Sequence, residues 1–68
     1  MNLIIDIGNT FAKLAVFSQG EMIKMLRCSN QSLEEVEALC LQYPIRQGIL
    51  SSVIALNDTI REQLGSLS

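Results

Sequence analysis

The chain has 68 residues, of which 49% are apolar and 18% are charged, and its formal net charge at pH 7 is −2. So high an apolar share excludes an intrinsically disordered chain. The five basic residues are scattered, which argues against direct binding of nucleic acid. The apolar runs are short and broken by charges, and the N-terminus lacks the basic start of a signal peptide. We therefore expect no membrane-spanning segment and a cytoplasmic location.

The first predicted element is a strand over Leu3–Ile7, an apolar run rich in β-branched residues. Only Asp6 interrupts this run, which is typical of a strand covered on both faces in the middle of a sheet. The segment Gly8–Thr10 then turns the chain, because its residue types tolerate positive φ. A second strand over Phe11–Phe17 completes a β-hairpin.

The loop of this hairpin carries the groups that bind a polyphosphate. Gly8 lets the backbone approach an anion, and N–H groups at a turn can converge on phosphate oxygens. Asn9 and Thr10 add side-chain donors, and Lys13 adds a positive charge. A buried Asp6 would be costly unless it is paired or close to a metal, so we expect a Mg²⁺ held directly or through water. The alternative is a plain hairpin in which Asp6 caps turn N–H groups and Lys13 is solvated.

A second turn over Ser18–Glu21 leads to a third strand over Met22–Arg27, and the three strands form an antiparallel meander. The imperfect alternation of Met22–Arg27 is typical of a strand near the sheet edge. Two cysteines, Cys28 and Cys40, fit no zinc pattern in a chain without histidine. We expect both to be small core residues.

The spacing Ser32-x-x-Glu35 predicts a capping box at the start of a helix, and Pro44 should stop this helix near Gln42 or Tyr43. We expect the acidic residues of its first turns to form a solvated face and not a metal site; they are Glu34, Glu35 and Glu37. The apolar stripe of the helix consists of Leu33, Val36, Leu39, Cys40 and Tyr43.

A fourth strand is predicted over Gly48–Ile54, and a crossover through the helix makes it parallel to Leu3–Ile7. The resulting strand order is 3-2-1-4. Ser51 and Ser52 then lie at the edge of the sheet where α/β proteins bind ligands, so one of them could line a nucleotide cleft. The favoured interpretation is that both are ordinary strand-end hydroxyls that bond nearby backbone.

A final helix is predicted to begin after Asn57, which is a suitable N-cap, and Asp58 also has a capping position. Its apolar side consists of Ile60, Leu64 and Leu67.

The motif Asp6-x-Gly8-Asn9-Thr10, with Lys13 three residues later, resembles the phosphate-1 loop of the acetate and sugar kinase/Hsp70/actin superfamily. Its Gly-Asn-Thr form followed by Lys resembles the type III pantothenate kinases, also known as the Baf family. The strand end Ser51-Ser52-Val53 also resembles that family. The family usually has a proline after this strand, and this chain has Ile54-Ala55-Leu56 there instead. The order of strands and helices resembles that of the family over most of the chain. Only the loop 6–13 is a highly specific sign of the family.

This resemblance implies an α/β fold, the N-terminal part of a ribonuclease H-like (actin-like ATPase) domain, with residues 1–68 as a single incomplete subdomain. It implies ATP-dependent phosphorylation of pantothenate to 4'-phosphopantothenate, the first step of coenzyme A biosynthesis. The implied cofactors are ATP, Mg²⁺ and a monovalent cation (K⁺ or NH₄⁺), and the implied assembly is a homodimer. The residues expected to bind the ATP phosphates are Asp6, Gly8, Asn9, Thr10 and Lys13, with Asp6 next to Mg²⁺, through water.

The same resemblance places the general base, an aspartate, after Ser68. We therefore expect no catalytic residue in this chain and no activity from the 68 residues alone. Two alternatives remain open at this stage. One is a nucleotide-binding module that transfers no phosphoryl group, and the other is a Baf-type transcriptional regulator.

Overall fold

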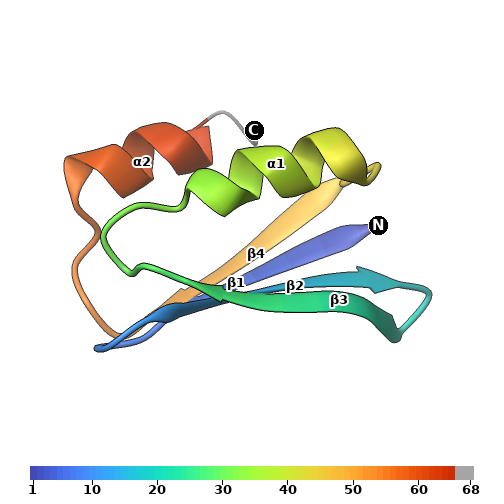
Figure 1. Ribbon diagram of the computed structural model, residues 1–68, viewed down its shortest axis with the longest axis horizontal. Coiled ribbons are helices and arrows are strands. Elements are labelled where there is room, and N and C mark those ends of the chain that lie inside the picture. The colour runs from blue at the N-terminus through green and yellow to red at the C-terminus, as the bar shows by residue number, and fades with distance from the viewer. Residues whose placement is uncertain (66–68) are drawn as a thin grey trace.

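A four-stranded mixed sheet lies under two helices in the computed structural model, which describes residues 1–65 (Figure 1). The order of the strands is β3-β2-β1-β4, as predicted. β1 is antiparallel to β2, β2 is antiparallel to β3, and β1 is parallel to β4. The elements are β1 (Asn2–Ile7), β2 (Ala12–Ser18), β3 (Glu21–Cys28), α1 (Glu34–Gln42), β4 (Gln47–Ser52) and α2 (Asp58–Gly65). None of the helices within residues 1–65 is long and apolar enough to cross a membrane.

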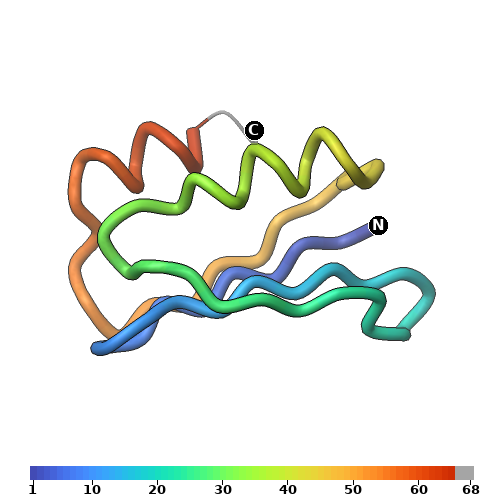
Figure 2. The backbone as a smooth tube through the Cα atoms, viewed as in Figure 1, coloured from blue at the N-terminus to red at the C-terminus, as the bar shows by residue number. Residues whose placement is uncertain are grey.

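The central strand β1 buries only one of its two faces. Leu3, Ile5 and Ile7 point toward the helices and are at most 1% exposed. The alternate residues Ile4 and Asp6 lie on the opposite face, where Ile4 is half-buried and Asp6 is exposed. Both helices lie on the same side of the sheet (Figures 1 and 2). The expectation of a strand covered on both faces is therefore wrong for the described residues.

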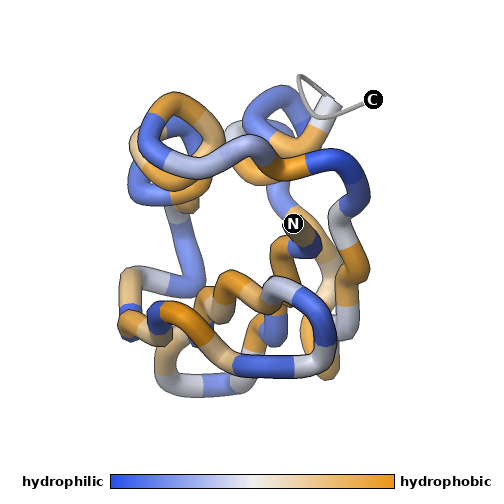
Figure 3. Tube along the Cα trace, turned by 90° about the vertical axis from the view of Figure 1, so that its right-hand side faces the viewer, coloured by the Kyte–Doolittle hydropathy of each residue, from blue (hydrophilic) through white to orange (hydrophobic). Residues whose placement is uncertain are grey.

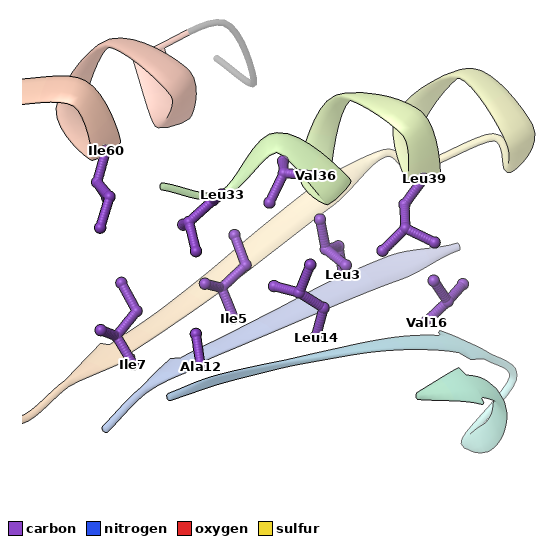
Figure 4. Packing of buried hydrophobic residues seen from close by; sticks show 10 residues of the cluster. All are labelled: Leu3, Ile5, Ile7, Ala12, Leu14, Val16, Leu33, Val36, Leu39 and Ile60. Carbon is purple, nitrogen blue, oxygen red and sulfur yellow. The ribbon is translucent and has the colours of Figure 1, made fainter. Parts of the chain in front are cut away.

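One apolar core fills the space between the sheet and the helices. Viewed end-on, the two helices lie side by side above the sheet, and each alternates between hydrophilic and hydrophobic residues (Figure 3). This alternation is typical of amphipathic helices that rest on a core. Both cysteines are free, half-buried and packed against the core, as predicted. The core itself consists of Leu3, Ile5, Ile7, Ala12, Leu14, Val16, Leu33, Val36, Leu39 and Ile60 (Figure 4).

The start of α1 differs from the predicted capping box. Leu33 occupies the cap position and no side chain caps the helix locally. Instead, Gln63 of α2 accepts a hydrogen bond from the Leu33 N–H at 2.6 Å and donates one to the Ser32 hydroxyl at 3.0 Å. The predicted capping box is wrong because the Ser32 hydroxyl is bonded to Gln63 of α2 and makes no side-chain cap on α1.

Glu35 does not join the predicted solvated face, because its side chain is half-buried. One of its carboxylate oxygens is buried and has no hydrogen-bond partner among residues 1–65. The pKa of the neighbouring Cys28 thiol is raised to about 11, first by burial and then by the charge of Glu35 and a hydrogen bond to it. Burial also raises the pKa of Cys40. The predicted solvated face is therefore confirmed for Glu34 and Glu37, which are exposed, and wrong for Glu35.

The end of β4 and the start of α2 are fixed by short-range hydrogen bonds. The Ser52 hydroxyl donates to the Ile54 carbonyl at 2.7 Å and accepts from the Ile54 N–H at 3.2 Å, so the strand ends at Ser52 and not at Ile54. Asn57 caps α2 as predicted, its Oδ1 accepting from the Ile60 N–H at 2.8 Å. Asp58 is the first helical residue and not the cap. Ile60 is buried and Leu64 half-buried, whereas Leu67 lies outside the described residues.

Candidate functional site

The loop between β1 and β2 forms one side of an open pocket of about 220 Å³. All five residues that the sequence predicts as phosphate ligands contribute to its lining, together with an aromatic ring that was not predicted. The lining consists of Asp6, Gly8, Asn9, Thr10, Phe11 and Lys13. The loop lies beside the segment that follows β4 (Figure 2), and the Val53 N–H donates to the Ile7 carbonyl at 3.0 Å.

Gly8 is required by a close backbone approach inside this loop. Its N–H donates to the Phe11 carbonyl at 2.9 Å, and a Cβ added to Gly8 would lie 3.1 Å from the same oxygen. Among residues 1–65, positive φ occurs only at Gln19 and Gly20, which form the turn between β2 and β3. The predicted turn over Gly8–Thr10 therefore forms without positive φ, although its residue types tolerate it, and it closes by a narrow backbone contact.

Three loop N–H groups remain available to an anion. The Gly8 N–H is already engaged by Phe11, but those of Asn9, Thr10 and Phe11 have no acceptor among residues 1–65. Successive free N–H groups in a turn are a common anion-binding arrangement. The N–H groups of this loop that could meet an anion are therefore those of residues 9–11 and not that of Gly8.

Asn30, in the connector between β3 and α1, holds the outer side of the loop. Its Nδ2 donates to the Gly8 carbonyl at 3.1 Å and to the Asn9 carbonyl at 2.9 Å. Asn30 was not predicted, because the polar connector carries no local pattern that distinguishes it from its neighbours.

Two cations flank the ring of Phe11 beside the pocket. The Lys13 ammonium lies 5.9 Å from the ring centroid, and the Arg27 guanidinium carbon lies 4.7 Å from it. Lys13 and Arg27 are register partners between β2 and β3. Basic residues that are scattered in the sequence are thus brought together, and Arg27 could have been found from the register of the predicted meander. Positive charge gathered beside a cavity favours an anionic ligand.

Asp6 lies next to Lys13 in the antiparallel ladder and is exposed. The premise that Asp6 is buried is therefore wrong, because its side chain is exposed, while the Mg²⁺ expected beside it stays a prediction. Among residues 1–65 no group of three or more His, Cys, Asp or Glu side chains could enclose a metal. A single accessible carboxylate still fits Mg²⁺ that arrives with a nucleotide, since this ion commonly binds one or two carboxylates, phosphate oxygens and water.

The two serines of β4 lie where the sequence predicts. Ser51 is the parallel-register partner of Asp6, and Ser52 is that of Ile7. Neither contributes to the lining of the pocket. The Ser52 hydroxyl is used in the turn after β4, which confirms the interpretation of an ordinary strand-end hydroxyl for that residue.

Comparison with known proteins gives a consistent set of relatives. The chain is 55% identical over 67 residues to a type III pantothenate kinase of Phocaeicola vulgatus and 49% identical over 67 residues to one of Bacteroides fragilis. It is 41% identical over 66 residues to one of Christiangramia forsetii. These matches cover 94–98% of the chain, which spans only about 28% of the length of these curated relatives. No family model and no solved structure matches the chain. The resemblance drawn from the motif 6–13 is therefore confirmed and extends over nearly the whole chain.

Proposed function

Because this chain is homologous to part of the type III pantothenate kinases, we propose that it forms the ATP phosphate-binding part of a pantothenate kinase. The full-length protein would transfer the γ-phosphoryl group of ATP to the primary hydroxyl of pantothenate, giving 4'-phosphopantothenate in the first step of coenzyme A biosynthesis. The observation that carries this proposal is the match to four curated relatives of that name at 41–55% identity. The pocket at the β1–β2 loop supports it, because an anion has space beside the motif.

The proposed chemistry is mostly positioning and neutralisation of charge, as in other phosphoryl transfers. The free N–H groups of residues 9–11 would donate to phosphate oxygens, and the side chains of Asn9 and Thr10 would add donors. Lys13 would neutralise charge on the phosphates. Asp6 would hold Mg²⁺ through water, and the bound ion would supply further neutralisation of the phosphate charge.

For the full-length protein, the proposal includes the features that the resemblance implies. They are a monovalent cation, K⁺ or NH₄⁺, a homodimer and a cytoplasmic location.

The test is a phosphoryl-transfer assay of the full-length protein with MgATP and pantothenate. We expect release of ADP that depends on pantothenate, and a product heavier by one phosphoryl group in mass spectrometry. A pantothenate analogue without the primary hydroxyl is the matched control and should release no ADP. Binding of ATP without turnover would instead indicate a nucleotide-binding module, and a protein that binds no ATP would contradict the proposal entirely.

A further inference from the structure

The β1–β2 loop is held from outside by a side chain that does not line its pocket. Asn30 donates from Nδ2 to the carbonyls of both Gly8 and Asn9, at 3.1 and 2.9 Å, from a position 22 and 21 residues away in sequence. The pocket lining contains the loop residues but not Asn30. Asn30 therefore acts on the loop backbone, and any effect on a ligand would pass through that backbone.

The two hydrogen bonds fix the direction of the loop peptides. A carbonyl and the N–H of the following residue belong to the same planar peptide and point in opposite directions. Holding the Gly8 carbonyl against Asn30 consequently fixes the Asn9 N–H, and holding the Asn9 carbonyl fixes the Thr10 N–H. These are two of the three loop N–H groups that have no acceptor among residues 1–65. Asn30 thereby presets the donors that an anion would meet.

Asn30 is itself placed by helix α2. Asn57, the N-cap of α2, donates from Nδ2 to the Gln31 carbonyl at 2.9 Å, next to Asn30 in the chain. The Gln31 side chain donates to the Asn30 Oδ1 at 3.3 Å, which leaves the Asn30 Nδ2 facing the loop. The connector therefore has a fixed position relative to both α2 and the β1–β2 loop.

We infer that Asn30 is a positioning residue of the phosphate loop, whose amide presets the Asn9 and Thr10 N–H groups for the phosphates of a nucleotide. This inference rests on the proposed function. Its physical basis is preorganisation, because a loop that is already ordered loses less entropy when the ligand binds. Replacement of the amide by a carboxylate would remove both donors and place negative charge against two carbonyl oxygens.

The test compares MgATP binding and steady-state kinetics in full-length wild type, Asn30→Asp and Asn30→Ala. We expect Asn30→Asp to weaken MgATP binding about tenfold or more and Asn30→Ala to weaken it less. The KM for ATP should rise while the KM for pantothenate stays at the wild-type value, since a general loss of structure would raise both. The matched control is Asn2→Asp, which adds the same charge at an exposed position at the far end of β1.

The outcomes separate this inference from the proposed function. If the wild type binds no MgATP, the proposed function fails and the inference fails with it. If the wild type binds MgATP and both Asn30 variants bind it as tightly as the wild type does, only the inference is overturned. An equal loss in Asn2→Asp would also overturn it, because the effect would then be one of net charge. Should Asn30→Asp not fold, as judged by circular dichroism, Asn30→Ala decides the result by itself.

Discussion

Asp6 of β1 and Lys13 of β2 are direct partners across an antiparallel ladder. Each alternates with core residues of its own strand and therefore lies on the opposite face of the sheet from the core. Both helices cover the core face (Figure 1). Both side chains are exposed and both line the same pocket. An exposed pair of opposite charges contributes at most about 1 kcal/mol to stability. The pair is therefore better explained by what it offers a ligand than by what it adds to the fold.

Replacement of Asp6 by Asn should change the binding of MgATP while it leaves the stability of the fold nearly unchanged. Because Asp6 is exposed, we expect the free energy of unfolding in urea to change by no more than about 0.5 kcal/mol. Calorimetric titration should show that the dependence of ATP binding on Mg²⁺ is lost. A variant that keeps Mg²⁺-dependent binding would contradict the role proposed for this carboxylate.

Replacement of Lys13 by Gln should weaken ATP binding by roughly ten- to a hundredfold, since hydrogen bonds to charged groups are worth about 1.5–3 kcal/mol. The matched control is Lys24→Gln, which removes an exposed charge from β3 at the register position of Val16. Equilibrium binding at low and moderate salt measures both variants. Similar losses in the two would indicate a general effect of net charge and no specific contact at Lys13.

Gly8→Ala should impair the loop because the new Cβ would lie 3.1 Å from the Phe11 carbonyl, a backbone atom that cannot move without opening the loop. We expect a loss of stability of about 1–3 kcal/mol, which is typical of overpacking, together with weaker ATP binding. Gly65→Ala is the matched control, because a Cβ there meets nothing within 4 Å and the residue lies in α2. The control should be neutral or stabilising by up to about 1 kcal/mol, as measured by thermal unfolding. A Gly8→Ala protein as stable as wild type would show that the loop tolerates a wider conformation.

The Cys28 thiol should react slowly with iodoacetamide until the pH approaches its raised pKa of about 11. Since the folded-state pKa is above the ordinary value of 9.0, this thiol contributes stability that is complete below pH 9 and is lost as the pH rises to 11. Glu35→Gln should lower the pKa of Cys28 only in part, because burial is the larger cause. The extent of alkylation of Cys28, measured by mass spectrometry over a range of pH, gives this pKa in wild type and in the variant.

Cys40 provides the internal control, as burial alone raises its pKa. Its alkylation profile should be the same in wild type and in the Glu35→Gln variant. An unchanged Cys28 profile in that variant would contradict the contact with Glu35.

The sheet order could be predicted because hairpins and a crossover leave few alternatives for an apolar strand such as β1. The pocket residues could be predicted because they are contiguous within residues 6–13. Asn30 and Gln63 could not, since each acts on a segment at least 21 residues away and neither carries a local pattern. Asp6 was misjudged because the apolar run around it suggests burial on both faces, whereas the helices cover only the face of Leu3, Ile5 and Ile7.

The most direct test of the phosphate loop is the change in backbone amide chemical shifts when MgATP is added to full-length protein labelled with ¹⁵N. We predict that the largest shifts occur at Asn9, Thr10 and Phe11, whose N–H groups have no acceptor within residues 1–65. The amide of Gly8, which is bonded to Phe11, should shift less. If MgATP causes saturable shifts at other amides and the amides of residues 8–11 do not shift, this loop does not bind the nucleotide phosphates.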